Sequence, residues 1–325
     1  MHTLTRKSLF VGAMLLVSLA SAQTYPNKPV TIVVPYPAGG PSDYVARKIQ
    51  PGVSKALGQP LVIENVGGAG GTLGIQKALS ASADGHTIVQ GSPIDLIVTP
   101  LSLASAKYKS EDLRMAAQIV KGPLVLLARK DLPSSSADEL IAQAARPDAK
   151  DLSFGNNGQG GLYHLVAVQF SQRAGVKAIH VSYKGTAQAL NDLMGGQIDL
   201  LFAVFAGSIP TLVADGKVKV IGLAARAPIA AFAKLPVLTA HPKLSDFEYS
   251  SWAAVMVARS APDAVVQRLN KAVYETIANP DIRADFEAMG NTVAAPHSVA
   301  ELDGIYRSEI ERYRAIAKTI NLVPQ

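Results

Sequence analysis

The sequence predicts an α/β fold with largely parallel sheets. Apolar, β-branched runs alternate along the chain with segments whose apolar residues recur at helical spacing. A unit of strand, glycine-rich loop and helix start occurs three times, at residues 30–57, 152–170 and 178–194. Such alternation is typical of parallel sheets covered by helices, and the sequence shows neither an internal repeat nor a heptad seam.

The first residues have the pattern of a secretory signal. Arg6 and Lys7 precede an apolar run at 9–19, and Ala20-Ser21-Ala22 follows as a small-residue cleavage site. The apolar run is short for a membrane span, and an uncleaved anchor is the alternative. We expect residues 1–22 to be a signal peptide cleaved after Ala22, and the mature chain to be soluble and exported to the periplasm.

Composition excludes several classes of site. The chain contains no cysteine, so disulfides and thiolate metal ligands are excluded. Its formal charge of +6 falls by two, to +4, when Arg6 and Lys7 leave with the signal. Basic residues are scattered and aromatic residues make up only 6%, so we expect no nucleic-acid partner. The mild positive charge is compatible with a small anionic ligand.

The first strand–loop–helix unit contains a candidate anion site. Residues 30–34 form a β-branched run, residues 35–41 are rich in proline and glycine, and Ser42-Asp43 begins a helical series. The first N–H groups of a helix lack intrahelical partners, and glycines let an anion approach them. We interpret the loop as a carboxylate-binding turn, with a plain strand-to-helix connection as the alternative.

The next segment contains glycines without a dinucleotide motif. A strand at 60–64 leads into the glycine cluster at 67–71 and a short helix. The G-x-G-x-x-G spacing fails from either possible first glycine, so no cofactor is expected. A strand at 87–89 precedes Asp95, which lies among apolar residues. Asp95 is either a helix cap or surface acid, or a carboxylate in the cleft.

The second unit has the same order as the first. Strands at 114–120 and 124–128, broken by Lys121-Gly122-Pro123, precede it and suggest a crossing between domains. The unit has a short strand followed by a loop at 155–161, where Asn156 and Asn157 can add side-chain donors. His164, in the first turn of its helix, is either structural or part of the site.

The third unit has a strand at 178–181, a loop that contains Tyr183 and Gly185, and a helix to Met194. Strand and helix patterns continue to the end of the chain. The remaining strands are expected at 198–202, 218–223 and 252–257, and the remaining helices at 262–278, from 280 and from 298.

The spacings that mark common catalytic sites are missing. The six histidines form neither H-x-H nor H-E-x-x-H, and there is no G-x-S-x-G nucleophile motif and no P-loop. We therefore expect no metal and no enzymatic activity. A triad assembled from residues far apart in the sequence is the alternative.

Three segments resemble one known family, the Bug-type periplasmic solute receptors of tripartite tricarboxylate transporters. They are PYPAGGPSD at 35–43, ENVGGAGG at 64–71, and VSYKG at 181–185 together with DLMGGQID at 192–199. The first and third are specific in combination, and the second supports them. The resemblance extends over essentially the whole mature chain.

The resemblance implies a type II periplasmic-binding-protein fold, in which two α/β lobes enclose a central cleft and the chain crosses between them twice. The first lobe would comprise residues 23–122 and 225–325, and the second lobe residues 123–224. The loops at 36–43 and 155–161 would hold one carboxylate of a small organic acid between the lobes, partly through water.

The resemblance and the loop pattern together indicate a set of ligand-binding residues. They are Tyr36, Ala38, Gly39, Ser42, Asp43, Asp95, Asn156, Asn157, Gly158, Gly160, Tyr183, Gly185, Thr186 and Ala203. The expected partners are the organic acid and the membrane subunits of the transporter, and the receptor itself is expected to be a monomer.

Two of these positions depart from the family pattern. Ala203 stands where an acidic residue often follows the strand, and Asp95 stands where a small or hydroxyl residue is more usual. The exchange predicts a changed ligand pose, with a basic or amide group near Asp95 or a more apolar part near Ala203.

We therefore predict an extracytoplasmic receptor that captures an organic acid and delivers it to a membrane transporter. Two other functions fit the same scaffold. One is an exported α/β enzyme that acts on a carboxylic acid or ester, and the other is a ligand-sensing partner of a membrane kinase.

Overall fold

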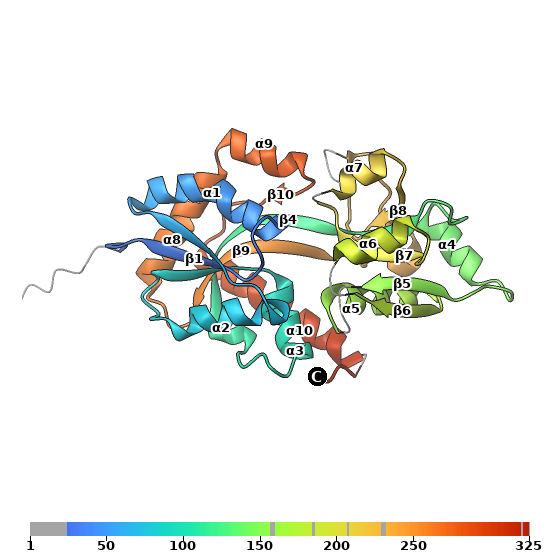
Figure 1. Cartoon of the computed structure of the whole chain (residues 1–325), viewed down its shortest axis with the longest axis horizontal. Coiled ribbons are helices and arrows are strands. Elements are labelled where there is room, and N and C mark those ends of the chain that lie inside the picture. Colours follow the sequence, from blue (N-terminus) through green and yellow to red (C-terminus); the bar gives the residue numbers. More distant parts are fainter. Residues whose placement is uncertain are drawn as a thin grey trace, which may run out of the picture.

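The computed structural model describes residues 25–156, 160–183, 186–206, 208–228, 232–319 and 321–324. The signal peptide predicted at 1–22 lies outside these residues. Figure 1 shows two groups of strands and helices side by side, with the strands β4 (Leu113–Arg129) and β9 (Ser250–Ala258) running between them. The predicted α/β class is confirmed.

Strands and helices alternate along most of the described chain. The other strands are β1 (Val30–Val34), β2 (Leu61–Asn65), β3 (Thr87–Gly91), β5 (Leu152–Asn156), β6 (Ala178–Ser182), β7 (Leu200–Val204), β8 (Val218–Leu223) and β10 (Thr292–Val293). The longer helices are α1 (Pro41–Leu57), α2 (Thr72–Ser80), α4 (Ala137–Ala144), α5 (Leu162–Ala174), α6 (Thr186–Met194), α8 (Asp263–Ile277), α9 (Pro280–Ala288) and α10 (Val299–Thr319). Shorter helical pieces include the π-helical turn η2 (Ile94–Val98), α3 (Thr99–Ser102) and α7 (Ile209–Ala214).

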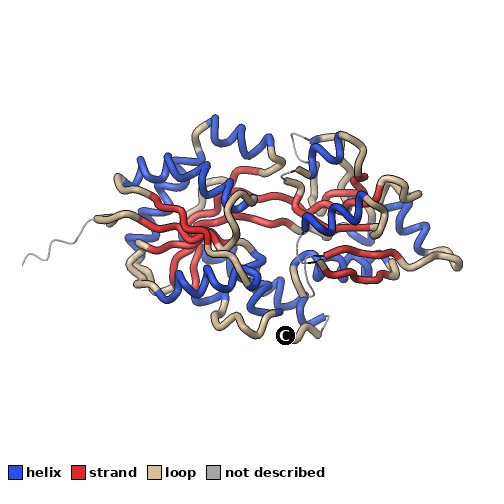
Figure 2. The backbone as a smooth tube through the Cα atoms, viewed as in Figure 1, coloured by secondary structure: helices blue, strands red, loops and turns tan. Residues whose placement is uncertain are grey.

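The strands follow the order β2-β1-β3-β9-β4-β7-β5-β6, and β8 and β10 also pair with β4. β1 is parallel to β2 and β3, and β5 is parallel to β6 and β7, whereas β4 and β9 are antiparallel to their neighbours. We call β1–β3 with α1, α2, α8 and α9 the first lobe, and β5–β8 with α4–α7 the second lobe. Figure 2 shows their two sets of strands joined through the middle.

β4 is one strand of 17 residues, whereas the sequence predicted two strands on either side of Lys121-Gly122-Pro123. Its first part pairs with β9 as far as Pro123, and from Leu124 onward it pairs with β7. Pro123 has no N–H to donate, but the strand changes partners at this residue, so the missing donor is tolerated. The Pro123 carbonyl accepts the Phe205 N–H at 3.1 Å. β4 therefore carries the chain unbroken from one lobe to the other.

Residues 232–249 pack on the second lobe, although the expected boundary at residue 225 assigned them to the first. The Phe247 ring packs against the rings of Phe170 and Phe202, with centroids 5.8 and 6.0 Å apart. Few residues of this segment form regular elements, so their packing could not be read from strand or helix spacing. We propose that the second crossing between the lobes lies at the start of β9, near Ser250.

The helices cover the sheet with the faces that sequence spacing predicted. The apolar stripe expected for α8 is buried throughout, and its members are Val265, Val266, Leu269, Val273 and Ile277. These residues share a core with the buried face of α1 on one side of the first lobe. Among the described residues, we find no helix with the length and apolar content that a membrane crossing requires.

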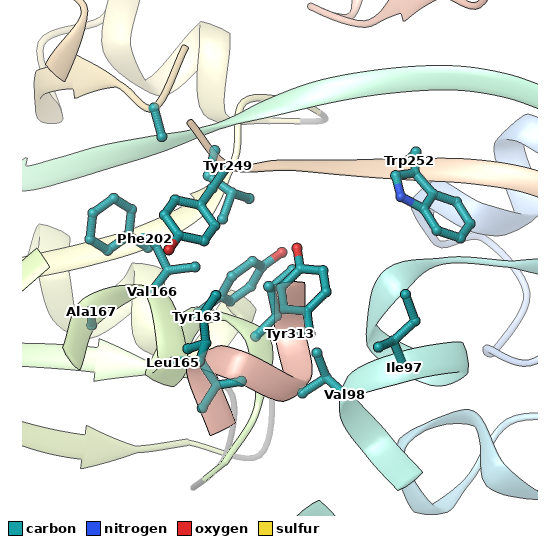
Figure 3. Close-up of a cluster of buried hydrophobic side chains, with 14 of the residues drawn as sticks. Ile97, Val98, Tyr163, Leu165, Val166, Ala167, Phe202, Tyr249, Trp252 and Tyr313 are labelled. Carbon is teal, nitrogen blue, oxygen red and sulfur yellow. The ribbon is translucent and has the colours of Figure 1, made fainter. Parts of the chain in front are cut away.

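α10 connects the two lobes. Its last turn contacts α5, where Gln169 Nε2 donates a 2.9 Å hydrogen bond to Thr319 Oγ1. Figure 3 shows Tyr313 of α10 between Leu165 of α5 and Val98 of η2. These three residues belong to one buried apolar cluster that continues from the first lobe into the second. The two lobes are therefore held in this arrangement by a shared core.

Candidate functional site

The loop between β1 and α1 makes a sharp turn into the helix. Gly39 has a φ of 82°, a left-handed value that favours glycine, and Gly40 is the extended N-cap residue before Pro41. Among the described residues, no side chain caps α1. The first N–H groups of α1 are therefore left without a side-chain partner, as the sequence predicted.

The buried side chain of Asp43 stabilises this turn. Its Oδ2 accepts the Gly39 N–H and the Arg47 Nε–H, both at 2.8 Å. The carboxylate is buried, and its hydrogen bond with the Arg47 guanidinium keeps the pKa of Asp43 below its ordinary value. Gly39 and Asp43 are predicted ligand-binding residues, whereas in the structure their polar groups bond to each other. Neither group is open to a ligand in this arrangement.

Ala38 and Ser42 flank the turn at more accessible positions. Ala38 is exposed and Ser42 is half-buried. The side chain of Gln90 in β3 donates a 2.8 Å hydrogen bond to the Ser42 carbonyl. This bond ties the start of α1 to the neighbouring strand, so the helix end has a fixed position relative to the sheet.

The second lobe contains the same kind of turn. Gly160 has a φ of 75°, and Gly161 is the extended N-cap residue of α5, with no cap from any described side chain. The Gly160 N–H donates a 3.0 Å hydrogen bond to Nδ1 of His164. In each lobe, therefore, a left-handed glycine donates to the side chain four residues later. The predicted residues Asn157, Gly158 and Gly185 lie outside the described residues.

Burial sets the charge of His164. Its ring packs edge-on against the ring of His180 in β6, with centroids 4.8 Å apart. Burial lowers the pKa of His164 to about 4, and His180 adds to this lowering. His164 is therefore neutral near pH 7, and one of its two ring nitrogens can accept a hydrogen bond. Within the described part of the chain, no group of histidine and acidic side chains could hold a metal ion.

Asp95 is fully buried, so its carboxylate is not exposed at the protein surface. Its Oδ1 accepts a 2.9 Å hydrogen bond from the Tyr36 hydroxyl, and the Ser92 N–H lies 3.1 and 3.2 Å from its two carboxylate oxygens. The Ser92 hydroxyl also donates to it. Burial raises the pKa of Asp95 to about 6. Asp95, predicted as a ligand-binding residue, is therefore bonded within the protein to Tyr36 and Ser92.

Tyr36 in the first lobe lies close to Tyr163 in the second. Burial and the Asp95 charge raise the pKa of Tyr36 well above its ordinary value, and the nearby Tyr163 hydroxyl adds to the rise. Burial also raises the pKa of Tyr163, and the Val204 main chain and the Thr186 side chain act against that rise. The structure thus brings Tyr36 and Thr186, both predicted site residues, to the two sides of one junction between the lobes.

Tyr163 and Ser92 are functional candidates that the sequence analysis missed. A signal for Tyr163 was present, because it stands two residues after the glycine pair of α5, as Ser42 stands after Gly40. Comparing the two glycine turns position by position would have found it. Ser92 carries no such signal, because its role depends on the burial of Asp95.

The remaining predicted residues occupy three different settings. The Tyr183 hydroxyl donates to Asp192 of the following helix α6 at 2.8 Å. Asn156 is fully buried at the end of β5, where its Oδ1 accepts the Ser182 hydroxyl at 3.0 Å. Ala203 is fully buried within β7 and belongs to an apolar core, so a ligand cannot reach its side chain in this arrangement.

The second lobe also touches the rest of the chain at two further places. A Cβ added to Gly290, in the turn after α9, would lie 2.5 Å from the carbonyl oxygen of Phe205 in the second lobe. A Cβ added to Gly160 would lie 2.9 Å from the side chains of Ser102 in α3 and of Leu322. The structure therefore shows the lobes in contact.

A separate cavity of about 430 Å³ lies between α5, α10 and the segment before β9. It is lined by Gln169, Arg173, Arg226, Asp246, Glu248, Tyr249, Arg312, Ala315, Ile316 and Thr319. Arg173 pairs with Asp246, and Arg226 pairs with Glu248 at 2.7 Å. Arg312, the third arginine of the lining, lies 4.4 Å from the centre of the Tyr249 ring and 3.9 Å from Glu309.

Comparison with known proteins agrees with the two-lobed architecture. A family model described as "Tripartite tricarboxylate transporter family receptor" matches residues 45–322. The periplasmic binding protein BugD is 28% identical, with a TM-score of 0.77 over 93% of this chain and 100% of BugD. MatC from Rhodopseudomonas palustris, solved with bound malate, is 29% identical, with a TM-score of 0.76 over 90% of this chain and 99% of MatC.

A third solved structure, R. palustris Rpa4515 with adipate, is 27% identical, with a TM-score of 0.80 over 93% of this chain and 100% of Rpa4515. These similarities confirm the periplasmic-binding-protein fold and the Bug-type resemblance. The chain belongs to the tripartite tricarboxylate transporter receptor family, and it is a solute receptor rather than an enzyme.

Proposed function

We propose that this protein is a periplasmic receptor that closes its lobes on a small organic carboxylate and delivers it to a tripartite tricarboxylate-type membrane transporter. The observation that carries the proposal is the pair of uncapped helix starts, at α1 and α5, each preceded by a glycine pair and placed on opposite lobes. Free N–H groups and the partial positive charge at such helix ends favour an anion. The malate and adipate held by two similar proteins support a carboxylate as that anion.

Main-chain donors suit this function because they are fixed in position and exchange no proton with the ligand. Hydrogen bonds to a charged group contribute about 1.5–3 kcal/mol each, and micromolar affinity corresponds to about 8 kcal/mol. A few such bonds together with apolar burial can reach this value after the cost of ordering and closure. A ligand that contacts both lobes only when they are closed shifts the population toward the closed form.

Calorimetric titration of the mature protein with a panel of organic acids tests the proposal. The panel includes malate, adipate, acidic amino acids and aromatic acids, each paired with its uncharged amide. We expect at least one acid to bind with one site per chain and to raise the melting temperature, while its amide does not. Binding of amides and acids with equal affinity, or binding of no acid, would contradict the proposal.

Export and delivery are tested separately from binding. Amino-terminal sequencing of the protein recovered from the periplasm should begin at Gln23 if the expected cleavage occurs. Cross-linking of the acid-bound protein in native membranes should capture transporter subunits. Capture of a membrane kinase instead would favour the sensing alternative.

A further inference from the structure

The two glycine turns are held by different kinds of acceptor. In the first-lobe turn, Gly39 donates to the charged carboxylate of Asp43, and Arg47 balances that charge with a 2.8 Å hydrogen bond. In the second-lobe turn, Gly160 donates to Nδ1 of His164 at 3.0 Å. The backbone conformations of the two left-handed glycines differ by only a few degrees in φ, at 82° and 75°. The same turn is therefore held in one lobe by a charged group and in the other by an imidazole.

The surroundings of His164 explain why the acceptor in the second-lobe turn is uncharged. Among the described residues, the titratable group that packs against it is His180, and burial lowers the pKa of both histidines. No described salt bridge brings an arginine or lysine to this place, in contrast to Arg47 beside Asp43. A carboxylate here would be buried without a balancing cation and would repel an anionic ligand. A neutral imidazole accepts the same N–H without adding charge.

We infer that His164 is a positioning residue, which accepts the Gly160 N–H and thereby fixes the second-lobe turn so that the first N–H groups of α5 remain directed out of the helix. What the turn binds rests on the proposed function, whereas the hydrogen bond itself requires no ligand. His164 acts on the ligand through Gly160 and Gly161 and is not proposed to touch it.

The first experiment uses nuclear magnetic resonance on the ligand-free mature protein with ¹⁵N-labelled histidine. At pH 7 we expect His164 to carry its proton on Nε2, with a scalar coupling between the Gly160 amide and Nδ1. On acidification, the His164 ring and the Gly160 amide should titrate together with a midpoint of about 4. A proton on Nδ1 of His164 at pH 7 would overturn the inference. So would a Gly160 amide resonance that does not shift as His164 titrates.

The second experiment compares substitutions, with malate or adipate as the probe. His164→Leu removes the acceptor, whereas His164→Asn places a side-chain oxygen near the position of Nδ1. We expect affinity to fall about tenfold or more in His164→Leu and by less than about threefold in His164→Asn. His241→Leu is the matched control, because His241 Nδ1 also accepts a main-chain N–H, from Lys243 at 3.1 Å, but in the segment before β9. The control should bind as the unmodified protein does.

The outcomes separate this inference from the proposed function. Unchanged affinity in His164→Leu, or an equal loss in His164→Leu and His164→Asn, would overturn the positioning role. If the unmodified protein binds neither acid while the resonance experiment succeeds, the proposed ligand is wrong and the Gly160–His164 bond stands. If His164→Leu does not fold, the resonance titration and the affinity of His164→Asn decide.

Discussion

The Tyr36 hydroxyl donates a 2.9 Å hydrogen bond to Oδ1 of Asp95, a carboxylate that is fully buried beneath the first-lobe turn. Ser92 supplies the other donors, and within the described residues no lysine or arginine forms a salt bridge with Asp95. The Tyr36 hydroxyl donates to this carboxylate and keeps its own proton, because burial and the Asp95 charge raise the pKa of Tyr36 well above its ordinary value. Asp95 therefore affects Tyr36 from a buried position.

Asp95→Asn should alter the pH dependence of stability. Burial raises the pKa of Asp95 to about 6, so the folded state holds the Asp95 proton more tightly than the unfolded state does. The favourable contribution is fully present below about pH 4 and is lost as the pH rises through about 6. Relative to the unmodified protein, the free energy of unfolding of Asp95→Asn should rise by up to about 3 kcal/mol between pH 4 and pH 7.5. Urea unfolding at the two pH values measures this, and a difference independent of pH would contradict it.

Tyr36→Phe should raise the pKa of Asp95 further. The hydroxyl stabilises the charged carboxylate, so its removal favours the protonated form by about one pH unit. Carbon-13 resonance of the Asp95 carboxyl across pH 4–9 measures the shift. Tyr25→Phe is the control, because the Tyr25 hydroxyl also makes one hydrogen bond, 2.7 Å to the Gly85 carbonyl, away from Asp95. An Asp95 titration that is identical in all three proteins would show that Tyr36 does not act on it.

Gly290→Ala should weaken the contact between the lobes. Gly290 has a φ of 81°, and an added Cβ would lie 2.5 Å from the Phe205 carbonyl oxygen. Gly196→Ala is a matched control, since Gly196 has a φ of 75° but has no atom within 4 Å of an added Cβ. The backbone strain is thus similar, and only Gly290→Ala adds a clash, which should cost about 1–3 kcal/mol more. Equal free energies of unfolding for the two variants would mean that the lobes separate freely at this contact.

Asp43→Asn should destabilise the first-lobe turn and remove one source of acid sensitivity. The pKa of Asp43 is lowered mainly by its hydrogen bond with Arg47, so its contribution is present above its ordinary pKa and is lost as the pH falls through the lowered value. At pH 7 we expect a loss of about 1–3 kcal/mol in the free energy of unfolding. Arg47→Ala should cost less than Asp43→Asn, because 56% of the Arg47 side chain is exposed and water screens its charge. A larger loss in Arg47→Ala than in Asp43→Asn would reverse our assignment.

Local pattern was sufficient where local interactions decide the structure. The β-branched run at 30–34 is β1, and the apolar series after Gly40 is the buried face of α1. Each depends on residues that are neighbours in the sequence, so spacing alone revealed them. The glycine pairs at 39–40 and 160–161 likewise mark the starts of α1 and α5, because a left-handed residue followed by an extended one is a local requirement.

Local pattern failed where residues far apart decide the outcome. The break expected at Lys121-Gly122-Pro123 is absent, because β9 pairs with β4 through this point. The buried carboxylate of Asp95 has a donor in Tyr36, 59 positions earlier in the sequence. The glycine N–H groups expected to face a ligand include two that side chains already occupy, at Gly39 and Gly160.

By itself, the sequence determined the α/β class, the helix ends that begin at glycine pairs, and the absence of thiol chemistry. Only the tertiary structure decided which glycine N–H groups side chains already occupy, that Asp95 is buried against Tyr36, and that Tyr163 of the other lobe interacts with Tyr36. The reason is physical. Strand and helix periodicity follows from steric and burial rules within a short segment, whereas hydrogen-bond occupancy and desolvation depend on every group that packing brings to the same place.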